Sequence, residues 1–399
     1  MSKNVPKIRF EGFSREWNST ILGELVNISS ASRVHKNEWR NEGVPFFRSS
    51  DVISKYMKKF NTPVFISDSL YQNLSKKSGK MEIGDLLVTG GGTIGIPYLI
   101  ENAEPLYFKD ADLIWFKSSD IIDGRFLFNY FVSPQTRRYI SSITHIGTIS
   151  HYTIEQGKNT PITLPDTEEQ QKIGSFFKQL DDTIALQQQL VEQQQQYKKA
   201  MLQKMFPQKD ERVPKVRFDG FIGDWAEKTL VEISKIIMGQ SPNGKNYTDN
   251  PEDYILVQGN ADMKNGRVVP RIWTTQITKT ASPGDLILSV RAPVGEIGIT
   301  DYDVVLGRGV AGIKANQFIY QTLLRMKLFG LWKKLSTGST FDSINSNDLK
   351  NIILLVPSLE EQHKIGTFFK QLDDTIAHHQ KNHENYQQLK KALLQRMFV

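Results

Sequence analysis

The sequence predicts an α+β protein in which two globular domains of mixed α/β structure are joined by two long helices that form an antiparallel coiled coil. One observation behind this fold class is an internal repeat. Residues 168–206 return as residues 360–398, with 27 of the 39 aligned positions identical and no gap. Another is a shorter repeat, in which residues 5–13 return as residues 213–221. The chain therefore has a pseudo-two-fold internal repeat, in which a short tag, a divergent region and a helix occur twice.

The two divergent regions are the predicted globular domains. The predicted boundaries are 1–165 for the first domain, 166–207 for the first helix, 208–357 for the second domain and 358–399 for the second helix. Each divergent region has about 150 residues, which is enough to bury a hydrophobic core. Short apolar runs predict strands at 85–88, 113–116, 285–290 and 352–356, and helices are predicted at 122–131 and 318–335. We expect two α+β domains of one fold with different surfaces.

Both long repeats predict helices that follow a proline and carry acidic residues in their first turn. Their apolar residues recur at alternating steps of four and three residues, which is a heptad seam. The predicted seam residues are Ile173, Phe177, Leu180, Ile184, Met201, Met205, Ile365, Phe369, Leu372, Ile376, Leu393 and Met397. The middle of the seam is polar, with Gln187 and Gln194 in the first copy and His379 and His383 in the second.

A long amphipathic helix needs a partner in water, and the repeat supplies one. A pseudo-two-fold relation between the copies makes the pair antiparallel, so that apolar ends meet apolar ends and the polar centres meet each other. In the alternative arrangement, each helix packs separately on its own domain.

The composition favours a polyanionic partner and excludes several kinds of chemistry. The chain has 50 Lys and Arg against 43 Asp and Glu, a net charge of +7, which is a modest surplus. It contains no cysteine, which excludes disulfides, cysteine-bound zinc, iron–sulfur clusters and thiol nucleophiles. The first residues lack an apolar signal core, and no apolar run is long enough to span a bilayer. We therefore expect a soluble, cytoplasmic protein without membrane association.

Three segments resemble known ligand-binding motifs, but each lacks a feature that the motif requires. Residues 90–95 have the glycine pattern of a dinucleotide-binding turn, but Pro97 follows where a helix should begin. Residues 239–246 resemble a phosphate-binding loop, but the last residue is Asn instead of the Ser or Thr that holds magnesium. His379 and His383 have the spacing of a metal pair, yet they occupy polar seam positions. We expect no catalytic residue and no metal site.

Basic, amide and hydroxyl side chains gather in the polar loops of both divergent regions. Arg, Asn and Gln can recognise base edges, while Lys, Ser and Thr can hold phosphates. The candidates in the first region are Arg33, Lys36, Arg40, Arg48, Ser49, Arg137, Arg138 and His151. The candidates in the second region are Gln240, Asn243, Lys245, Gln258, Asn260, Arg291, Arg308, Lys333, Lys334 and Thr340. The pattern favours nucleic-acid binding by both regions, and double-stranded DNA is the expected partner together with the resemblance described below. For any single residue, a solvated surface position is the alternative.

The beginnings of the two long helices resemble the specificity subunit of type I restriction-modification enzymes. Both carry P-x-x-E-E-Q-x-K-I-G-x-F-F-x-x-L-D, at residues 165–181 and 357–373. Residues 43–52, 289–295 and 338–349 also look like parts of such a subunit. The resemblance covers essentially the whole chain. It implies two target-recognition domains separated by two spacer helices.

The resemblance also implies a function. It implies a non-catalytic subunit that recognises a bipartite, asymmetric DNA site and is the scaffold for two methyltransferase subunits and two ATP-dependent endonuclease subunits. Those partners would bind S-adenosylmethionine, ATP and magnesium, so no cofactor is expected in this chain. The alternatives are a stand-alone DNA-modifying enzyme and a coiled-coil adaptor without a DNA role. An adenine methyltransferase would need a tetrapeptide like N-P-P-Y, and residues 250–253, N-P-E-D, differ from it at the last two positions.

Overall fold

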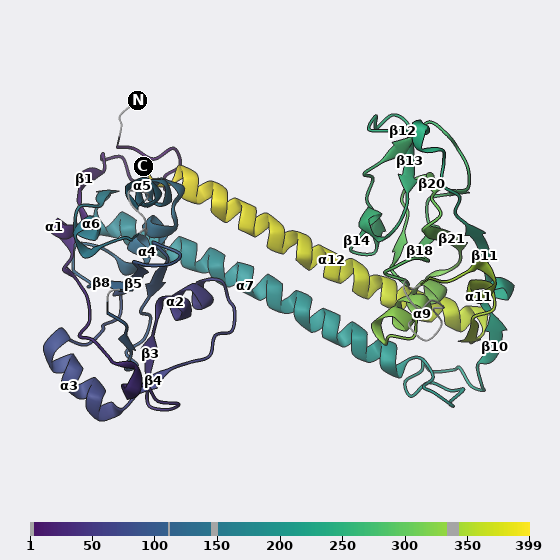
Figure 1. The fold of residues 1–399 in the computed structure, drawn as a ribbon, viewed down its shortest axis with the longest axis horizontal. Coiled ribbons are helices and arrows are strands. Elements are labelled where there is room, and N and C mark those ends of the chain that lie inside the picture. The colour runs from purple at the N-terminus through teal and green to yellow at the C-terminus, as the bar shows by residue number, and fades with distance from the viewer. Residues whose placement is uncertain (1–3, 111, 145–150, 333–342) are drawn as a thin grey trace. The chain divides into compact units, whose positions relative to one another are not determined.

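The computed structural model describes residues 4–110, 112–144, 151–332 and 343–399, and the chain divides into two compact units. Unit 1 comprises Met1–Gln188 and Lys381–Val399, and unit 2 comprises Gln189–Gln380. Both contain one globular domain and a portion of each long helix, α7 (Thr167–Lys204) and α12 (Leu359–Arg396) (Figure 1). Each unit therefore takes its helical part from two distant stretches of the chain.

A four-stranded antiparallel sheet lies at the centre of unit 1. Its order is β2 (Ile28–Ser29), β8 (Leu113–Phe116), β5 (Leu86–Thr89) and β6 (Pro97–Leu99). Every residue of β5 and β8 is buried, because both faces of the sheet are covered. Alternate residues of a strand face opposite sides. Leu86 and Phe116 contact the core that includes α7 and α4 (Gly124–Val132), whereas Leu87 and Trp115 contact the core beside α2 (Ser49–Tyr56).

A second sheet and several short helices complete unit 1. β3 (Val44–Phe47) pairs in parallel with β7 (Tyr107–Phe108) and antiparallel with β4 (Phe65–Ile66). β1 (Asn18–Ile21) pairs with β9 (Pro161–Leu164). The other helices are α1 (Leu22–Leu25), η1 (Lys36–Glu38), α3 (Asp68–Ser78), α5 (Pro134–Thr144) and α6 (Ile154–Lys158).

Unit 2 repeats this plan with more strands in each of its two main sheets. One sheet has the order β11 (Lys235–Met238), β21 (Val310–Lys314), β18 (Leu286–Ser289), β19 (Ile297–Ile299), β15 (Arg267–Val268) and β14 (Met263–Lys264). The other has the order β12 (Tyr247–Thr248), β16 (Trp273–Thr274), β13 (Tyr254–Val257), β20 (Val304–Leu306) and β17 (Thr280–Ala281). β10 (Ala226–Thr229) pairs with β22 (Ile353–Val356). The helices are α8 (Leu230–Ile233), η2 (Gly244–Asn246), η3 (Asn260–Asp262), α9 (Gln317–Leu328) and α11 (Ser346–Lys350).

The central sheets of the two units are equivalent. In unit 2, Leu286 and Ile313 face the core that includes the long helices, while Ile287 and Val310 face a separate core. The parallel pair β13 and β20 corresponds to β3 and β7 of unit 1. The predicted α+β class and the predicted similarity of the two folds are therefore confirmed.

The predicted strands and the first predicted helix agree with the structure to within one or two residues at each end. The prediction for residues 318–335 is wrong in its length, because α9 ends at Leu328. Gly330 has a φ of +69°, a left-handed conformation that stops a helix and that glycine adopts without steric cost. Residues 333–335 of that prediction lie outside the described residues.

Each repeated tag holds the first turn of a long helix through a forked ion pair. Arg9 donates two hydrogen bonds of 2.7 Å to Glu169, and Arg217 donates two of 2.8 Å to Glu361. Both glutamates are buried, and two parallel hydrogen bonds from a guanidinium are the strong geometry for such a pair. The two sequence repeats thus make one structural contact twice.

The two long helices run antiparallel within unit 1. Lys390 donates hydrogen bonds of 2.6 and 2.7 Å to the carboxylate of Asp181, and His383 Nδ1 lies 3.1 Å from the carbonyl oxygen of Ile184. As the residue number rises along α7, that of its partner on α12 falls. Each helix therefore packs on the other helix as well as on the domain.

The same arrangement occurs within unit 2. Lys198 donates a hydrogen bond of 2.5 Å to Asp373, and the ring of Phe206 lies 6.1 Å from that of Phe369. Burial lowers the pKa of Lys198, and the carboxylate of Asp373 opposes that shift. Asp373 also accepts a hydrogen bond of 2.8 Å from the buried side chain of Gln321. Through the sequence repeat, the ion pair of unit 2 is the counterpart of the one in unit 1.

The predicted seam residues lie on the packed faces of these helices. Those that are buried are Ile173, Phe177, Leu180, Ile184, Met205, Ile365, Phe369, Ile376 and Met397. Met201, Leu372 and Leu393 are partly buried, and Leu202 and Leu394, which the heptad pattern does not include, are buried more deeply. The physical reason is that a straight helix drifts by about 20° per heptad, which amounts to almost one residue after four heptads.

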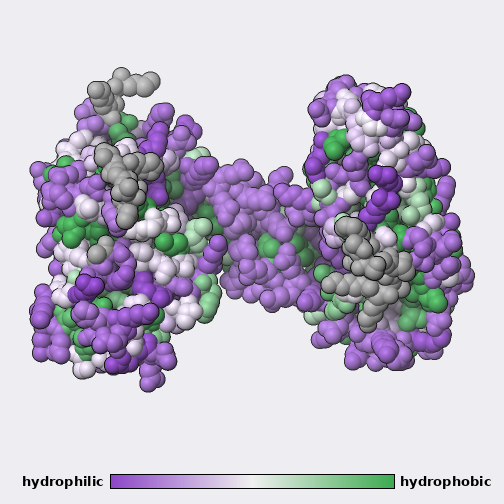
Figure 2. Space-filling model, viewed as in Figure 1, coloured by the Kyte–Doolittle hydropathy of each residue, from purple (hydrophilic) through white to green (hydrophobic). Residues whose placement is uncertain are grey.

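The exposed surface of the long helices is hydrophilic. Purple side chains cover most of the visible surface of α7 and α12 outside the globular domains (Figure 2). Within the described residues, no helix carries an apolar stretch long enough to cross a membrane. The buried apolar residues of α7 and α12 face a core or the other helix, and a few others, such as Leu186 and Leu389, are exposed.

Candidate functional site

Three connections between strands meet beside α2 in unit 1. They are the residues that follow β3, the turn between β5 and β6, and the loop between β7 and β8. Ser49 Oγ donates a hydrogen bond of 2.9 Å to the carbonyl oxygen of Asp112, and Gly90 N donates one of 2.8 Å to the same atom. The ring of the exposed His151 lies against Gly91, where a Cβ would be 3.6 Å from Nδ1. We call this group, residues 48–51, 90–92, 109, 112 and 151, the unit 1 cluster.

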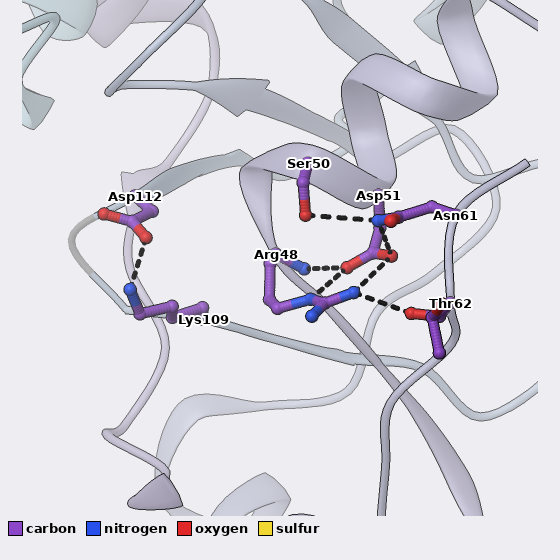
Figure 3. Close-up of polar contacts among 7 residues, drawn as sticks. All are labelled: Arg48, Ser50, Asp51, Asn61, Thr62, Lys109 and Asp112. Carbon is purple, nitrogen blue, oxygen red and sulfur yellow. Dashed lines mark hydrogen bonds and ion pairs between the residues drawn. The ribbon is translucent and has the colours of Figure 1, made fainter. Parts of the chain in front are cut away.

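Arg48 fixes the shape of the unit 1 cluster (Figure 3). Its Nε donates to Asp51 Oδ2 at 2.7 Å, and its Nη2 donates to Asp51 Oδ1 at 3.0 Å and to the carbonyl oxygen of Thr62 at 2.8 Å. The hydrogen bond to Asp51 raises the pKa of Arg48. Asn61 Nδ2 donates to Asp51 as well, at 2.7 Å. The guanidinium is therefore occupied in holding α2 against the segment that follows it.

Lys109 supplies a positive charge to the unit 1 cluster that the sequence does not single out. Its Nζ lies 2.5 Å from Asp112 Oδ2, and both side chains are more than one-third exposed (Figure 3). An exposed pair of this kind is weak and opens readily. Lys109 can therefore exchange its carboxylate partner for a phosphate.

Arg137 supports the glycine turn of unit 1 from behind. Its Nη1 donates hydrogen bonds of 2.8 and 2.6 Å to the carbonyl oxygens of Ile94 and Gly95. Burial lowers its pKa. Gly95 has a φ of +72°, and a Cβ there would lie 2.7 Å from Arg137 Nη1, so only glycine allows this approach. Arg137 thus positions the turn between β5 and β6.

The equivalent three connections of unit 2 enclose an open hollow of about 240 Å³. Its lining residues are Ser241, Tyr247, Gln258, Gly259, Asn260, Ser289, Arg291, Ala292, Arg308 and Gly309. We call this set the unit 2 hollow. Four of these residues, Gln258, Asn260, Arg291 and Arg308, are sequence candidates that the fold brings together from three separate loops.

A buried carboxylate fixes the unit 2 hollow as Asp51 fixes the unit 1 cluster. Asp262 Oδ2 accepts hydrogen bonds from the backbone N–H groups of Gln258 and Gly259, at 2.7 and 3.2 Å. A Cβ at Gly309 would lie 2.1 Å from the carbonyl oxygen of Gln258, so glycine is required where the first and third connections touch. The hollow presents amide, hydroxyl and guanidinium groups, which can donate and accept hydrogen bonds with base edges.

Comparison with known proteins identifies the family. The model of the type I restriction modification DNA specificity domain matches residues 14–194 and 222–386. The chain belongs to this specificity family. The two matched segments correspond to the two halves of the internal repeat, and the resemblance seen in the sequence is confirmed.

Relatives along the full length agree with the specificity family. The chain is 30% identical to the putative type I restriction enzyme MjaX specificity subunit of Methanocaldococcus jannaschii, over 98% of this chain and 95% of that protein. It is 24% identical to the type I restriction enzyme EcoBI specificity subunit of Escherichia coli, over 89% and 79%.

Solved structures show the same fold. The S subunit of a type I restriction-modification system from M. genitalium has a TM-score of 0.65 at 16% identity, over 99% of both chains. A chain from a structure on complex assembly and conformational transition of the type I R-M system has a TM-score of 0.57 at 22% identity, over 95% of this chain and 96% of that one.

The other candidates in unit 1 of this specificity-family chain lie on segments outside the cluster as defined. Arg33, Lys36 and Arg40 are exposed around η1, where Arg40 Nη1 donates to the carbonyl oxygens of Asn37 and Trp39 at 3.0 and 2.9 Å. Arg138 is exposed and lines a separate hollow of about 430 Å³. The η1 segment borders the unit 1 cluster through Trp39, whose ring centroid lies 5.9 Å from the guanidinium carbon of Arg48, whereas Arg138 lines a different hollow.

The other unit 2 candidates of this specificity-family chain border the hollow or fall outside the described residues. Gln240, Asn243 and Lys245 are exposed on the loop before β12. Gln240 precedes Ser241, whose Oγ accepts a hydrogen bond of 3.1 Å from Arg308 N. Asn243 Oδ1 accepts one of 3.2 Å from Lys245 N and so begins η2. Lys333, Lys334 and Thr340 lie outside the described residues.

Two further kinds of candidate residue have no simple signal in the sequence of this specificity-family chain. Ser289 and Tyr247 line the hollow, but neither has a charge that marks it. Asp51 and Asp262 are positioning residues: their carboxylates accept hydrogen bonds that fix the loops carrying the candidate residues. Among the residues that the structure describes, no group of three or more His, Asp and Glu side chains could hold a metal ion.

Proposed function

We propose that this chain is the DNA sequence-recognition subunit of a type I restriction-modification complex and that it recognises two unlike half-sites. The observation that carries the proposal is that equivalent connections of one fold carry different chemistry in the two units. Unit 1 offers hydroxyls, one lysine and one histidine. Unit 2 offers amides and two guanidinium groups, which suit adenine and guanine edges respectively. Different donors on one scaffold select different bases.

The target-recognition domains are residues 1–165 and 208–357, and residues 166–207 and 358–399 are the spacers between them. We propose that α7 and α12 form one antiparallel coiled coil along their whole length. The antiparallel contacts within each unit and the repeated ion pairs support this. The coiled coil would set the number of base pairs between the half-sites. The DNA site is therefore bipartite and asymmetric.

The chemistry belongs to partner proteins in this proposal. Two methyltransferase subunits would bind S-adenosylmethionine, and two ATP-dependent endonuclease subunits would bind ATP and magnesium. A number of two fits a chain whose tag and helix contact occurs twice, because equivalent surfaces bind equivalent partners. The chain itself is then a scaffold without catalytic activity.

Methylome sequencing of a host with and without this chain tests the proposal. We expect one bipartite motif with unequal half-sites to lose methylation when the chain is removed. An unchanged methylome in a host that carries the methyltransferase subunit would contradict the recognition role.

Two assays on the purified chain separate the alternatives. Methylation by the chain alone, with S-adenosylmethionine and magnesium, would favour a stand-alone enzyme. DNA binding that does not weaken as salt rises, or no DNA binding at all, would favour an adaptor, because phosphate contacts are lost with salt.

A further inference from the structure

The segment that follows α2 presents an unusual combination of side chains to solvent. Phe60 is 89% exposed and Met57 is 54% exposed, and Lys58 and Lys59 between them are exposed as well. We call Met57, Lys58, Lys59, Phe60 and Asn61 the α2 strip. A single exposed apolar residue is ordinary on a protein surface. The position and the surroundings of Phe60 are what point to a ligand.

The α2 strip is held at both ends. At one end, Met57 N donates to Ile53 O at 2.9 Å and Lys59 N donates to Ser54 O at 2.8 Å. At the other end, Asn61 Nδ2 donates to Asp51 Oδ1 at 2.7 Å (Figure 3). The strip therefore returns along α2 from its last turn to its first.

The strip begins with a turn, because Lys58 has a φ of +52° in the left-handed region, and the residues that follow lead back along α2. Asn61 Nδ2 also lies 3.2 Å from Ser50 Oγ, so Phe60 is only one residue from the unit 1 cluster. A strip anchored at both ends loses little conformational freedom when it binds.

The charge of the segment identifies the class of partner. Residues 52–67 contain three lysines and no Asp or Glu. An apolar protein surface would have to desolvate these lysines without a counter-charge, whereas a nucleic acid supplies phosphates for them. An exposed aromatic ring directly after two lysines can then meet the stack of bases, which is the largest apolar surface of a duplex.

We propose that the α2 strip is a second DNA contact of unit 1, in which Phe60 enters a base step from the minor groove while Lys58 and Lys59 bind the adjacent phosphates. Apolar side chains that enter base steps in this way unstack and bend the duplex. The inference rests on the proposed function, because it adds a contact beside the half-site of unit 1.

Unit 2 has a different structure at the equivalent place. The hairpin of β14 and β15 follows η3 there, and Arg267 of this hairpin pairs with Ile299 of β19. The side chain of Arg267 forms an ion pair of 2.7 Å with Asp301. The insertion of Phe60, which we call the wedge, therefore occurs only beside the half-site that unit 1 recognises. The DNA is then bent beside one half-site and not beside the other.

The test uses the full chain with its methyltransferase subunits on a duplex that carries the motif mapped by methylome sequencing. 2-Aminopurine, whose fluorescence rises when it is unstacked, is placed at successive positions through and beside both half-sites. We expect one position next to one half-site to brighten on binding. Phe60→Ala should abolish that signal and weaken binding roughly tenfold, as expected for the loss of one base–aromatic contact.

Two further variants sharpen the test. Lys58→Ala and Lys59→Ala should each reduce the slope of log affinity against log salt by about 1. The control is Ile222→Ala, since Ile222 is 92% exposed in unit 2 but lies between Asp219 and Asp224. It should leave fluorescence, affinity and salt slope unchanged.

The outcomes separate this inference from the proposed function. Motif-specific binding with an unchanged 2-aminopurine signal and unchanged affinity in Phe60→Ala would overturn the wedge and leave the recognition role intact. Loss of methyltransferase association in Phe60→Ala, measured by light scattering without DNA, would show that the strip is a protein contact instead. A wild-type complex that does not prefer its motif would overturn the proposed function and the wedge together.

Discussion

Arg291 and Arg308 carry the exposed positive charge of the unit 2 hollow, and they yield the most direct prediction for single residues. Arg291→Ala and Arg308→Ala should each weaken binding to the cognate duplex by about 1–3 kcal/mol, because each removes a guanidinium that can bond to a guanine edge. Each should also relax the sequence preference at one position of one half-site only. Fluorescence anisotropy on a set of single-base variants of the motif measures both effects.

The matched control is Arg212→Ala. Arg212 is also an exposed arginine of unit 2, but it pairs with Glu227, away from the hollow. It should change affinity by a small amount and leave every position of the motif unchanged. Relaxed preference in both half-sites on substitution of Arg291 would count against separate recognition by the two units.

The two repeated ion pairs give a prediction for stability. Asp373→Asn should lower the free energy of unfolding by about 2 kcal/mol, because it leaves Lys198 buried without its carboxylate and disturbs the hydrogen bond from Gln321. Asp181→Asn removes the counterpart, whose lysine is more exposed, and should cost about 1 kcal/mol or less. Urea unfolding of the two variants under identical conditions measures the difference.

The pH dependence of that difference follows from Lys198. Burial lowers its pKa in the folded chain, so between the folded and the unfolded pKa the unfolded chain binds the proton that the folded chain has released. Stability therefore rises with pH across that window. The excess cost of Asp373→Asn should shrink as the pH approaches the usual pKa of lysine, and an excess that grows with pH would contradict the assignment.

At the scale of residues, the sequence predicts which types of side chain form the candidate site better than it predicts which individual residues do. Gln258, Asn260, Arg291 and Arg308 do line one hollow. Arg137 is different, because the carbonyl groups that it binds are more than 40 residues away in the sequence and only the fold brings them near. Arg48 offers a local signal, since Asp51 stands three residues later, but that spacing does not show that the carboxylate is buried.

The long helices are the elements that should set the spacing of the DNA site. Insertion or deletion of one heptad within residues 187–195 shifts one helix by about 10 Å, or roughly three base pairs. The unrecognised gap in the motif should change while both half-sites stay the same. Methylome sequencing of the variants measures gap and half-sites together. Altered half-sites with an unaltered gap would contradict the spacer role.

At the scale of elements, the heptad pattern predicts the helices and most of their packed residues but not the shift at their ends. Leu202 and Leu394 take over from Met201 and Leu393 because the helix keeps its own period of 3.6 residues while the pattern assumes 3.5. The overlong prediction beyond Leu328 has another cause. The apolar residues continue past Gly330, and periodicity alone does not register a left-handed glycine.

At the scale of the whole molecule, half of the chain should be able to rebuild the repeat. Residues 1–206 contain one tag, one domain and one long helix, whose seam would be exposed in a monomer. We expect an antiparallel homodimer, in which Phe206 of one copy takes the place of Phe398 in the other. With methyltransferase, it should modify a palindrome of the unit 1 half-site. Light scattering and methylome sequencing of the fragment measure these outcomes.

Two substitutions make that prediction sharp. Leu180→Asp with Ile184→Asp should abolish the dimer, because the change buries charge in the seam. A change on the exposed face of the same helix, Lys178→Ala, should leave it intact. A stable, folded monomer of residues 1–206 would contradict both the dimer and the continuous antiparallel pairing.

The sequence predicts the plan of the molecule because the repeat is nearly identical where the helices begin and end. It does not predict that the same three connections form the candidate site in both units. Residues 84–86 and 284–286 can be aligned, and with them the turn that follows, but the other two connections share too little sequence. Their equivalence depends on strand pairing, such as that of β3 with β7 and of β13 with β20. The loops can be matched between the units only once it is known which strands pair in each unit.

The place of Phe398 has a consequence for how the chain is made. Its ring packs against Trp17, Phe126, Tyr130 and Phe177 in the core of unit 1. A ribosome synthesises those four aromatic residues more than 200 residues before Phe398, so the core of unit 1 stays incomplete while the intervening chain is made. During that interval the nascent chain already contains Phe206, the repeat-related ring. Phe206 packs against Trp225, Phe318 and Phe369 in the finished chain, so correct folding requires that it leave the equivalent position in unit 1 to Phe398.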